Sequence, residues 1–292
     1  MKNYYTMIEE AQKAKKPHFL IVLIIPYLLM SLANIVALFV TPLGLFYFLI
    51  INFGLTALFM GLYARKVDKR NFPSLGLTKK GFIKDNLLGL ALGILMIVII
   101  MLIMLITGNA SILDRPLTPK VLTGVLIMFP AWAVQGFSEE FLVRGYMFPT
   151  LSNRYGLKFG VLISASYFAL LHIGNPNVTV LGIINILLVG IIFTLMVMVH
   201  DNLWVASGFH IGWNYAQGHL VGIPVSGMGV GDSLTSFSVK NNLYTGGDFG
   251  MEGGLICTLV LLALGFLYFL FLKQKRINLE KNSDNNESLG LS

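Results

Sequence analysis

Long uninterrupted runs of apolar residues, separated by short polar segments, dominate the chain. A membrane-spanning helix needs roughly 20 consecutive apolar residues, because the hydrocarbon core of a bilayer is about 30 Å thick and each helical residue rises about 1.5 Å. About eight runs reach this length, and we expect each to be a transmembrane helix. They lie at residues 19–40, 43–64, 86–107, 121–145, 158–175, 178–199, 203–221 and 254–272. The pattern predicts an all-α polytopic membrane protein.

Composition and charge agree with this fold class, since 55% of the 292 residues are hydrophobic and only 12% are charged. Soluble domains carry about twice that charged fraction. Nearly all of the 21 Lys and Arg residues lie in the two terminal segments and in alternate loops, and the other loops hold Arg115, Lys120 and Lys240. Positive charge collects on the cytoplasmic side of membrane proteins, so both termini are predicted to be cytoplasmic. The net charge of +7 is then an orientation signal, and no nucleic-acid partner is expected.

The fourth apolar run closes on FSEEFLVRG, residues 137–145, which places two carboxylates and a guanidinium in an otherwise apolar helix. A charged side chain near the bilayer centre costs about 2.5–3.5 kcal/mol on insertion scales. Glu140 and Arg144 are four residues apart, so they lie on one face of a helix and can pair. Glu139 is rotated by about 100° from Glu140, which leaves its carboxylate available for chemistry.

Two further pairs with helical spacing lie in later runs: Phe168 with His172, and His210 with Asn214. If they converge with Glu139, the set would offer a base, two imidazoles that hold a water molecule or a metal ion, and an amide that donates to an oxyanion. Those groups suffice to hydrolyse an amide bond. Each pair also has a structural interpretation, because an intramembrane His, Asn or Glu–Arg pair can instead join helices or gate a transporter.

In this order, the patterns EExxxR, FxxxH and HxxxN resemble the three motifs of the CPBP intramembrane proteases, also called the CAAX protease and bacteriocin-processing, or Abi, family. The similarity covers roughly residues 120–272 and includes GGDFGMEGGL before the last run. The first three runs match the family in hydropathy only.

The resemblance implies a role for each motif residue. Glu139 would activate a water molecule that His172 holds, while His210 and Asn214 would stabilise the oxyanion. The supporting residues would be Glu140, Arg144 and Phe168. Glu139, His172 and His210 together could bind Zn²⁺ or act without a metal, so no cofactor is certain.

The chain is expected to divide into an N-terminal interfacial segment (1–18), the first three transmembrane helices (19–115), a CPBP-like catalytic core (116–272) and a polar cytoplasmic tail (273–292), of which residues 279–292 should be disordered. Pro130 should kink the fourth helix, and the Gly-rich loop 222–253 should hold little regular structure. If the fourth helix descends and the fifth ascends, Glu139 and His172 lie at different depths. Their meeting then requires a long, tilted or broken helix.

These patterns favour a multi-pass endopeptidase of a bacterial cytoplasmic membrane, acting on a membrane-associated peptide or protein. Processing of a peptide, bacteriocin or pheromone precursor, or self-immunity, is the expected role. The sequence has no HExxH, the motif of the common zinc proteases. A non-proteolytic immunity or binding protein, or a small transporter, is the alternative.

Overall fold

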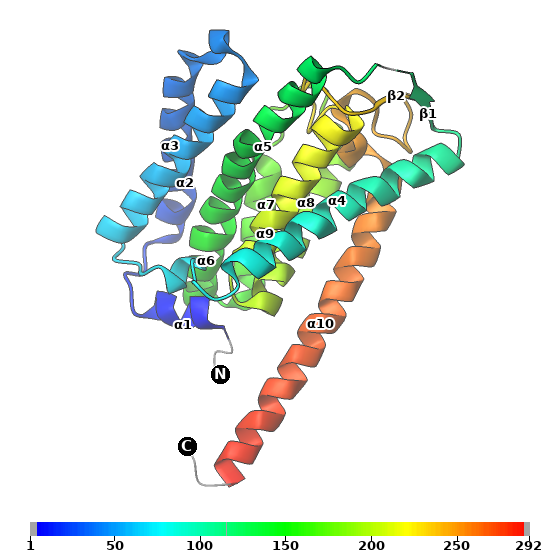
Figure 1. Ribbon diagram of the computed structural model, residues 1–292. Coiled ribbons are helices and arrows are strands. Elements are labelled where there is room, and N and C mark those ends of the chain that lie inside the picture. The colour runs from blue at the N-terminus through cyan, green and yellow to red at the C-terminus, as the bar shows by residue number, and fades with distance from the viewer. Residues whose placement is uncertain (1–4, 115, 289–292) are drawn as a thin grey trace.

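Apolar helices that run side by side form the body of the protein in the computed structural model, which describes residues 5–114 and 116–288 (Figure 1). Arg115 and the ends of the first and last predicted segments lie outside these residues. The α-helices are α1 (Thr6–Gln12), α2 (Phe19–Leu38), α3 (Leu45–Lys66), α4 (Phe82–Ile106), α5 (Pro119–Glu140), α6 (Phe148–Tyr155), α7 (Leu157–Leu170), α8 (Val180–His200), α9 (Trp204–Tyr215) and α10 (Leu255–Ser288). Two π-helical segments, η3 (Phe141–Met147) and η4 (Ala216–Val221), continue α5 and α9. Short 3₁₀ turns are η1 (Thr41–Leu43), η2 (Pro73–Leu75), η5 (Gly247–Phe249) and η6 (Met251–Gly253).

Within the described residues, six helices are long and apolar enough to cross a membrane: α2, α3, α4, the continuous α5–η3–α6 rod, α8 and α10. The other two predicted spans are also helical but shorter, since α7 has 14 residues and α9 has 12 before η4 continues it. The multi-pass helical class is therefore confirmed, whereas a count of eight spans is not. Both described ends of the chain lie at the same end of the bundle (Figure 1). Their cytoplasmic placement stays a prediction.

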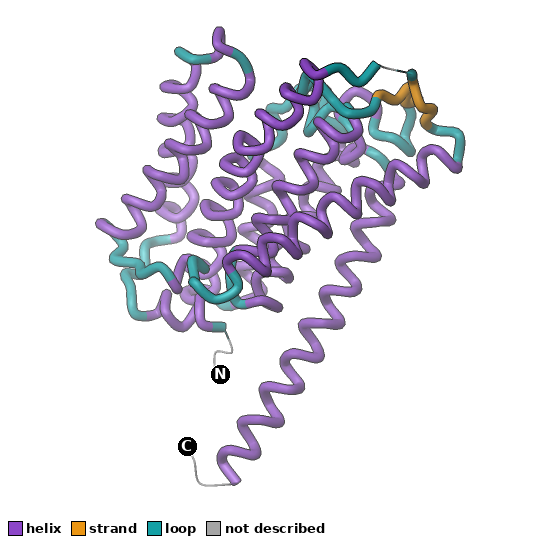
Figure 2. Tube along the Cα trace, in the orientation of Figure 1, coloured by secondary structure: helices purple, strands orange, loops and turns teal. Residues whose placement is uncertain are grey.

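The helices from the N-terminal and C-terminal parts of the chain pack together and enclose a central space. The α2–α3 hairpin packs against α5, α5 packs against α9, and α8 lies between α7 and α10. Figure 2 shows the loops gathered at the two ends of the bundle. Large apolar side chains are exposed along α2, among them Leu28 (53%) and Ile35 (57%), which is the expected face for lipid.

Glycines form a seam between α4 and α9. Gly89 and Gly93 of α4 face the main chain of α9, and Gly208 and Gly212 of α9 face the main chain of α4 in return. A Cβ atom built on any of the four would collide with a carbonyl oxygen of the other helix. Glycines four residues apart let helix backbones approach closely in membranes. Because α9 carries two of the predicted site residues, this glycine seam sets their position.

We expect Gly212→Val to push α9 away from α4 and to destabilise the protein by about 1–3 kcal/mol, the usual range for an overpacked core. The displacement should also lower any activity that depends on His210. Unfolding of the purified protein by sodium dodecyl sulfate measures the first effect. Gly229→Val is the control, because a Cβ at Gly229 meets no atom within 4 Å. Equal losses from both substitutions would show that the seam has no special role.

The loop between η4 and α10 is more regular than expected. β1 (Ala110–Leu113), which follows α4, pairs antiparallel with β2 (Ser236–Val239) inside the Gly-rich loop, with Ala110 opposite Val239. The expectation of little regular structure is therefore wrong for these residues. A four-residue strand is too short to give a recognisable pattern, and its partner comes from a distant part of the chain.

α10 continues beyond its apolar run to Ser288, so the expected disorder is wrong for residues 279–288. Lys275 Nζ donates to two carbonyl oxygens in the last turn of α8, at 2.8 and 2.9 Å. A cation at the open carbonyl groups of a helix C-terminus is favourable, which anchors the start of this extension. The predicted interfacial segment contains α1, where the amide of Thr6 donates to Asp201 Oδ2 (3.2 Å).

Candidate active site

Two carboxylates lie where a regular α-helix changes into a π-helix. α5 is capped by Thr118, whose Oγ1 accepts a hydrogen bond from the Val121 amide (3.3 Å), and it ends on Glu139 and Glu140. The helix continues through Pro130 without a break, and the irregular turn η3 begins only after the carboxylates. A π-helical turn is wider than a turn of α-helix, and such turns often occur at functional sites.

Arg144 pairs with Glu140, as the spacing predicted, and both side chains are completely buried. Arg144 NH1 lies 3.1 Å from Glu140 Oε1, and NH2 donates to the carbonyl oxygen of Gly190 on α8 (2.9 Å). The guanidinium also lies over the rings of Phe168 (4.5 Å) and Phe193 (5.2 Å). The cation is therefore held by a carboxylate, a carbonyl and two aromatic faces, which offsets the cost of its burial.

His210 touches both carboxylates. Its Nδ1 lies 3.0 Å from Glu140 Oε1, the same oxygen that Arg144 binds. An ionised carboxylate only accepts, so Nδ1 carries the hydrogen. Nε2 then points towards Glu139 Oε2 at 3.6 Å, longer than a hydrogen bond. The sequence predicted Glu140 as a partner for Arg144 and missed that it also orients His210.

His172 reaches the same region because α7 is short. α7 ends at Leu170 after 14 residues, or about 21 Å, which is less than the thickness of a bilayer core. His172 in the following turn can therefore lie partway through the membrane, which resolves the expected mismatch in depth. Its Nδ1 lies 2.8 Å from the Phe168 carbonyl oxygen, an acceptor, so Nδ1 carries the hydrogen and Nε2 is left as an acceptor.

Asn214 lies one turn after His210 on α9, with its side chain in the same cavity. Its Nδ2 donates to Gln135 Oε1 of α5 (2.9 Å). An amide nitrogen carries two hydrogens, so one is available for a ligand. Gln135 is a contact that the motifs did not include.

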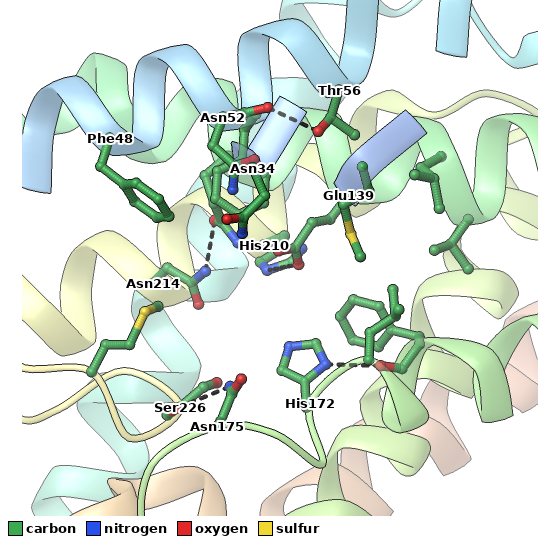
Figure 3. Close-up of a pocket in the computed structure, with 18 of the residues that line it drawn as sticks. Asn34, Phe48, Asn52, Thr56, Glu139, His172, Asn175, His210, Asn214 and Ser226 are labelled. Carbon is green, nitrogen blue, oxygen red and sulfur yellow. Dashed lines mark hydrogen bonds and ion pairs between the residues drawn. The ribbon is translucent and has the colours of Figure 1, made fainter. Parts of the chain in front are cut away.

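The predicted residues meet around a cavity of about 520 Å³. Glu139, Phe168, His172, His210 and Asn214 line it, and Figure 3 shows Glu139 and His172 entering it from different sides. Glu140 and Arg144 lie behind this wall and do not reach the cavity. Apart from apolar and aromatic side chains, the lining consists of Ser31, Asn34, Asn52, Thr56, Gln135, Glu139, His172, Asn175, His210, Asn214 and Ser226.

The donor groups do not fit a metal site. Among the described residues, no group of three or more His, Cys, Asp and Glu side chains is placed to hold a metal ion. Zinc sites in proteins need at least three such ligands at about 2 Å from the metal. Glu139, His172 and His210, the set considered for Zn²⁺, therefore lack the required arrangement. The proposed hydrolysis accordingly uses protein groups and water.

Sequence reasoning missed the polar residues that α2, α3 and the Gly-rich loop bring to the cavity. Asn34 comes from α2, Asn52 from α3, and Ser226 from the loop after η4. The sequence did contain a signal for Asn34 and Asn52, because a carboxamide inside an apolar run is costly unless it binds a partner or a ligand. Ser226 carried no such signal, since it belongs to a polar loop.

A buried carboxylate, Glu252 of η6, holds the loop that carries Ser226. Glu252 accepts hydrogen bonds from Gln217 Nε2 (2.5 Å), Ser226 Oγ (3.1 Å) and the Ser226 amide (3.3 Å). Burial raises the pKa of the Glu252 carboxyl, and these donors oppose the shift. On the other side of the loop, Asn175 Nδ2 donates to the Ser226 carbonyl oxygen (3.0 Å). The loop is thus fixed as one wall of the cavity.

We expect Glu252→Ala to release this wall, because it removes the acceptor of three hydrogen bonds from Gln217 and Ser226, each worth about 0.5–1.5 kcal/mol. Hydrogen exchange of residues 222–228 should become faster, and the rate of peptide cleavage should fall. Glu252→Gln keeps one acceptor oxygen and should give a smaller effect. Unchanged exchange in the Ala variant would show that Glu252 does not hold the loop.

One of three comparisons with known proteins gave a match, and it covers the segment that carries the motif residues. Residues 121–216 match the family model described as type II CAAX prenyl endopeptidase Rce1-like. A search of curated proteins and a search of solved structures each gave no match to the chain. All of the predicted site residues fall within the matched segment, so the resemblance drawn from the three motifs is confirmed. Residues 121–216, which carry all of the motif residues, are therefore similar to the Rce1-like family of type II CAAX prenyl endopeptidases.

Proposed function

We propose that the protein is a CAAX-protease-like intramembrane endopeptidase that hydrolyses a peptide bond with water activated by Glu139. One observation carries the proposal: Glu139 Oε2 is buried and has no hydrogen-bond partner among the described residues, in a cavity that also receives His172 and Asn214. An unpaired carboxylate oxygen is an available acceptor for a proton from water. The family match supports the reaction class.

In this mechanism, a water molecule donates one hydrogen to Glu139 Oε2 and the other to His172 Nε2. Glu139 takes its proton while the water oxygen attacks the carbonyl carbon of the peptide. The carbonyl oxygen becomes an oxyanion, to which Asn214 Nδ2 donates, as does His210 Nε2 when its ring is protonated on both nitrogens. Glu139 then returns the proton to the leaving nitrogen, the C–N bond breaks as the oxyanion re-forms a carbonyl, and a carboxylic acid and an amine result; the acid then loses its proton to solvent.

The cavity also limits the substrate. It reaches the exposed side of α2 at Tyr27 (54%) and Ile35 (57%), so a peptide in the bilayer can enter from that side. No Lys or Arg lies among the described lining residues. The segment around the cleaved bond should therefore be neutral and largely apolar, because a carboxylate there would have no Lys or Arg to pair with and would lie near the carboxylate of Glu139.

The test uses the purified protein in lipid vesicles. A fluorogenic CAAX peptide with a prenylated cysteine and a pool of hydrophobic peptides of random sequence serve as probes. Cleavage of either probe is the expected result, and no cleavage of any peptide would contradict the proposal. A role in peptide processing or self-immunity in a bacterial membrane stays a prediction.

A further inference from the structure

Two asparagines of the first helical hairpin enter the cavity from outside the segment that matches the protease family. Asn34 lies on α2 and Asn52 on α3, both within membrane-length helices. Figure 3 shows their side chains on the side of the cavity opposite His172, Asn175 and Ser226. The proposed mechanism uses neither of them.

The Asn52 carboxamide has no partner within the described residues. Asn52 is only 4% exposed, and its Oδ1 is buried without a hydrogen bond. The nearby Thr56 hydroxyl donates to the Asn52 main-chain carbonyl (2.8 Å) and not to its side chain. A buried amide without a partner costs roughly 1–3 kcal/mol on protein mutational data. An apolar residue would avoid this cost, so the amide is best explained by a ligand that enters the cavity.

Asn34 differs from Asn52 in being exposed, so its lack of a partner carries no cost of burial. It lies on the exposed side of α2 and makes no hydrogen bond with any described residue. By contrast, the carboxamide oxygen of Gln135, which also lines the cavity, already accepts a hydrogen bond from Asn214 Nδ2. Two unused carboxamides therefore face the space in which Glu139 would activate water.

The chemistry of the ligand follows from these groups. A carboxamide offers one acceptor and one donor group, which match the N–H and C=O of a peptide main chain. Because no Lys or Arg is found among the described lining residues, an anionic ligand would meet no permanently charged cation there. An extended, uncharged polypeptide segment meets both conditions, and main-chain hydrogen bonds are the general way in which such segments are bound.

We propose that Asn52, with Asn34 beside it, binds the main chain of an extended peptide substrate and holds the bond to be cleaved against Glu139. This inference rests on the proposed function and adds α2 and α3 to the substrate-binding site. Asn52 Oδ1 accepts a hydrogen bond from a substrate main-chain N–H near the cleaved bond. Binding through the main chain leaves the side chains of the substrate to the apolar part of the cavity.

The test pairs a protein variant with a change in the substrate. The fluorogenic prenylated CAAX peptide is compared with ester analogues, in each of which one main-chain N–H near the cleaved bond is replaced by oxygen. For the wild-type protein, one analogue should lose about tenfold in kcat/KM, chiefly through KM, as expected for one hydrogen bond to a buried acceptor. For Asn52→Ala, the all-amide peptide should already show this loss, and the same ester should cause less than a twofold further change.

Asn86→Ala is the matched control, because Asn86 lies on α4 outside the cavity and its Nδ2 donates to the Phe82 carbonyl of its own helix (2.7 Å). It should behave as the wild type with every peptide. Equal sensitivity of wild type and Asn52→Ala to all esters would overturn the inference while leaving the proposed function intact. Undiminished cleavage by Glu139→Gln, or no cleavage by the wild type, would instead overturn the proposed function and this inference with it.

Discussion

Glu139→Gln is expected to reduce peptide cleavage by about 10²–10⁴-fold, the range that a general base contributes. Gln has nearly the same shape as Glu but cannot accept a proton from water. The loss should appear in kcat, because the variant keeps the cavity wall and its carboxamides. Single-turnover cleavage of the prenylated peptide by protein in vesicles measures it.

Glu9→Gln on the exposed face of α1 serves as the control for loss of a carboxylate and should keep full activity. Binding of the uncleaved peptide to Glu139→Gln, followed by fluorescence anisotropy, should equal that of the wild type within about twofold. Loss of binding together with cleavage would assign Glu139 to substrate binding and not to activation of water.

Arg144→Met is expected to give the largest loss of stability, about 3–5 kcal/mol, because it leaves the fully buried Glu140 without its cation. The second substitution, Glu140→Gln, should recover most of this loss in the double variant. Gln can still accept the hydrogen from His210 Nδ1 and carries no charge. Unfolding in detergent by sodium dodecyl sulfate measures the stability of Arg144→Met, of Glu140→Gln and of the double variant, each relative to the wild type.

The double-mutant comparison separates two explanations of the buried charges. If Arg144 and Glu140 form one neutral unit, the two substitutions are strongly non-additive. If the double variant loses the sum of the two single effects, the residues act independently. The second result would contradict the interpretation of the pair as a mutually neutralised unit.

The candidate site residues on and next to α5, α7 and α9 could be predicted because each motif pairs residues that are four positions apart, and so share one face of a helix. Glu140 and Arg144 pair at four residues as expected, and Glu139 faces the cavity while Glu140 does not. Polar groups are so rare in apolar helices that few placements had to be considered. The order of the three motifs along the chain then gave the resemblance to the CPBP family.

The geometry between elements could not be predicted in the same way. The end of α7 was expected at 175, although the sequence Gly174–Asn175–Pro176 already signals a turn. The apolar run passes smoothly into this turn, so hydropathy alone extended the helix. The partners of Glu252 come from η4 and the loop after it, and no local pattern records such contacts.

In the proposed reaction, Glu139 activates the water that cleaves the peptide. Single-turnover cleavage in ¹⁸O-labelled water, with a metal chelator present, tests this directly. For the wild type, we expect one solvent oxygen in the new carboxylate and a rate unchanged by the chelator, and for Glu139→Gln we expect almost no product. Cleavage by Glu139→Gln at the wild-type rate, or a wild-type rate that the chelator abolishes and Zn²⁺ restores, would contradict it.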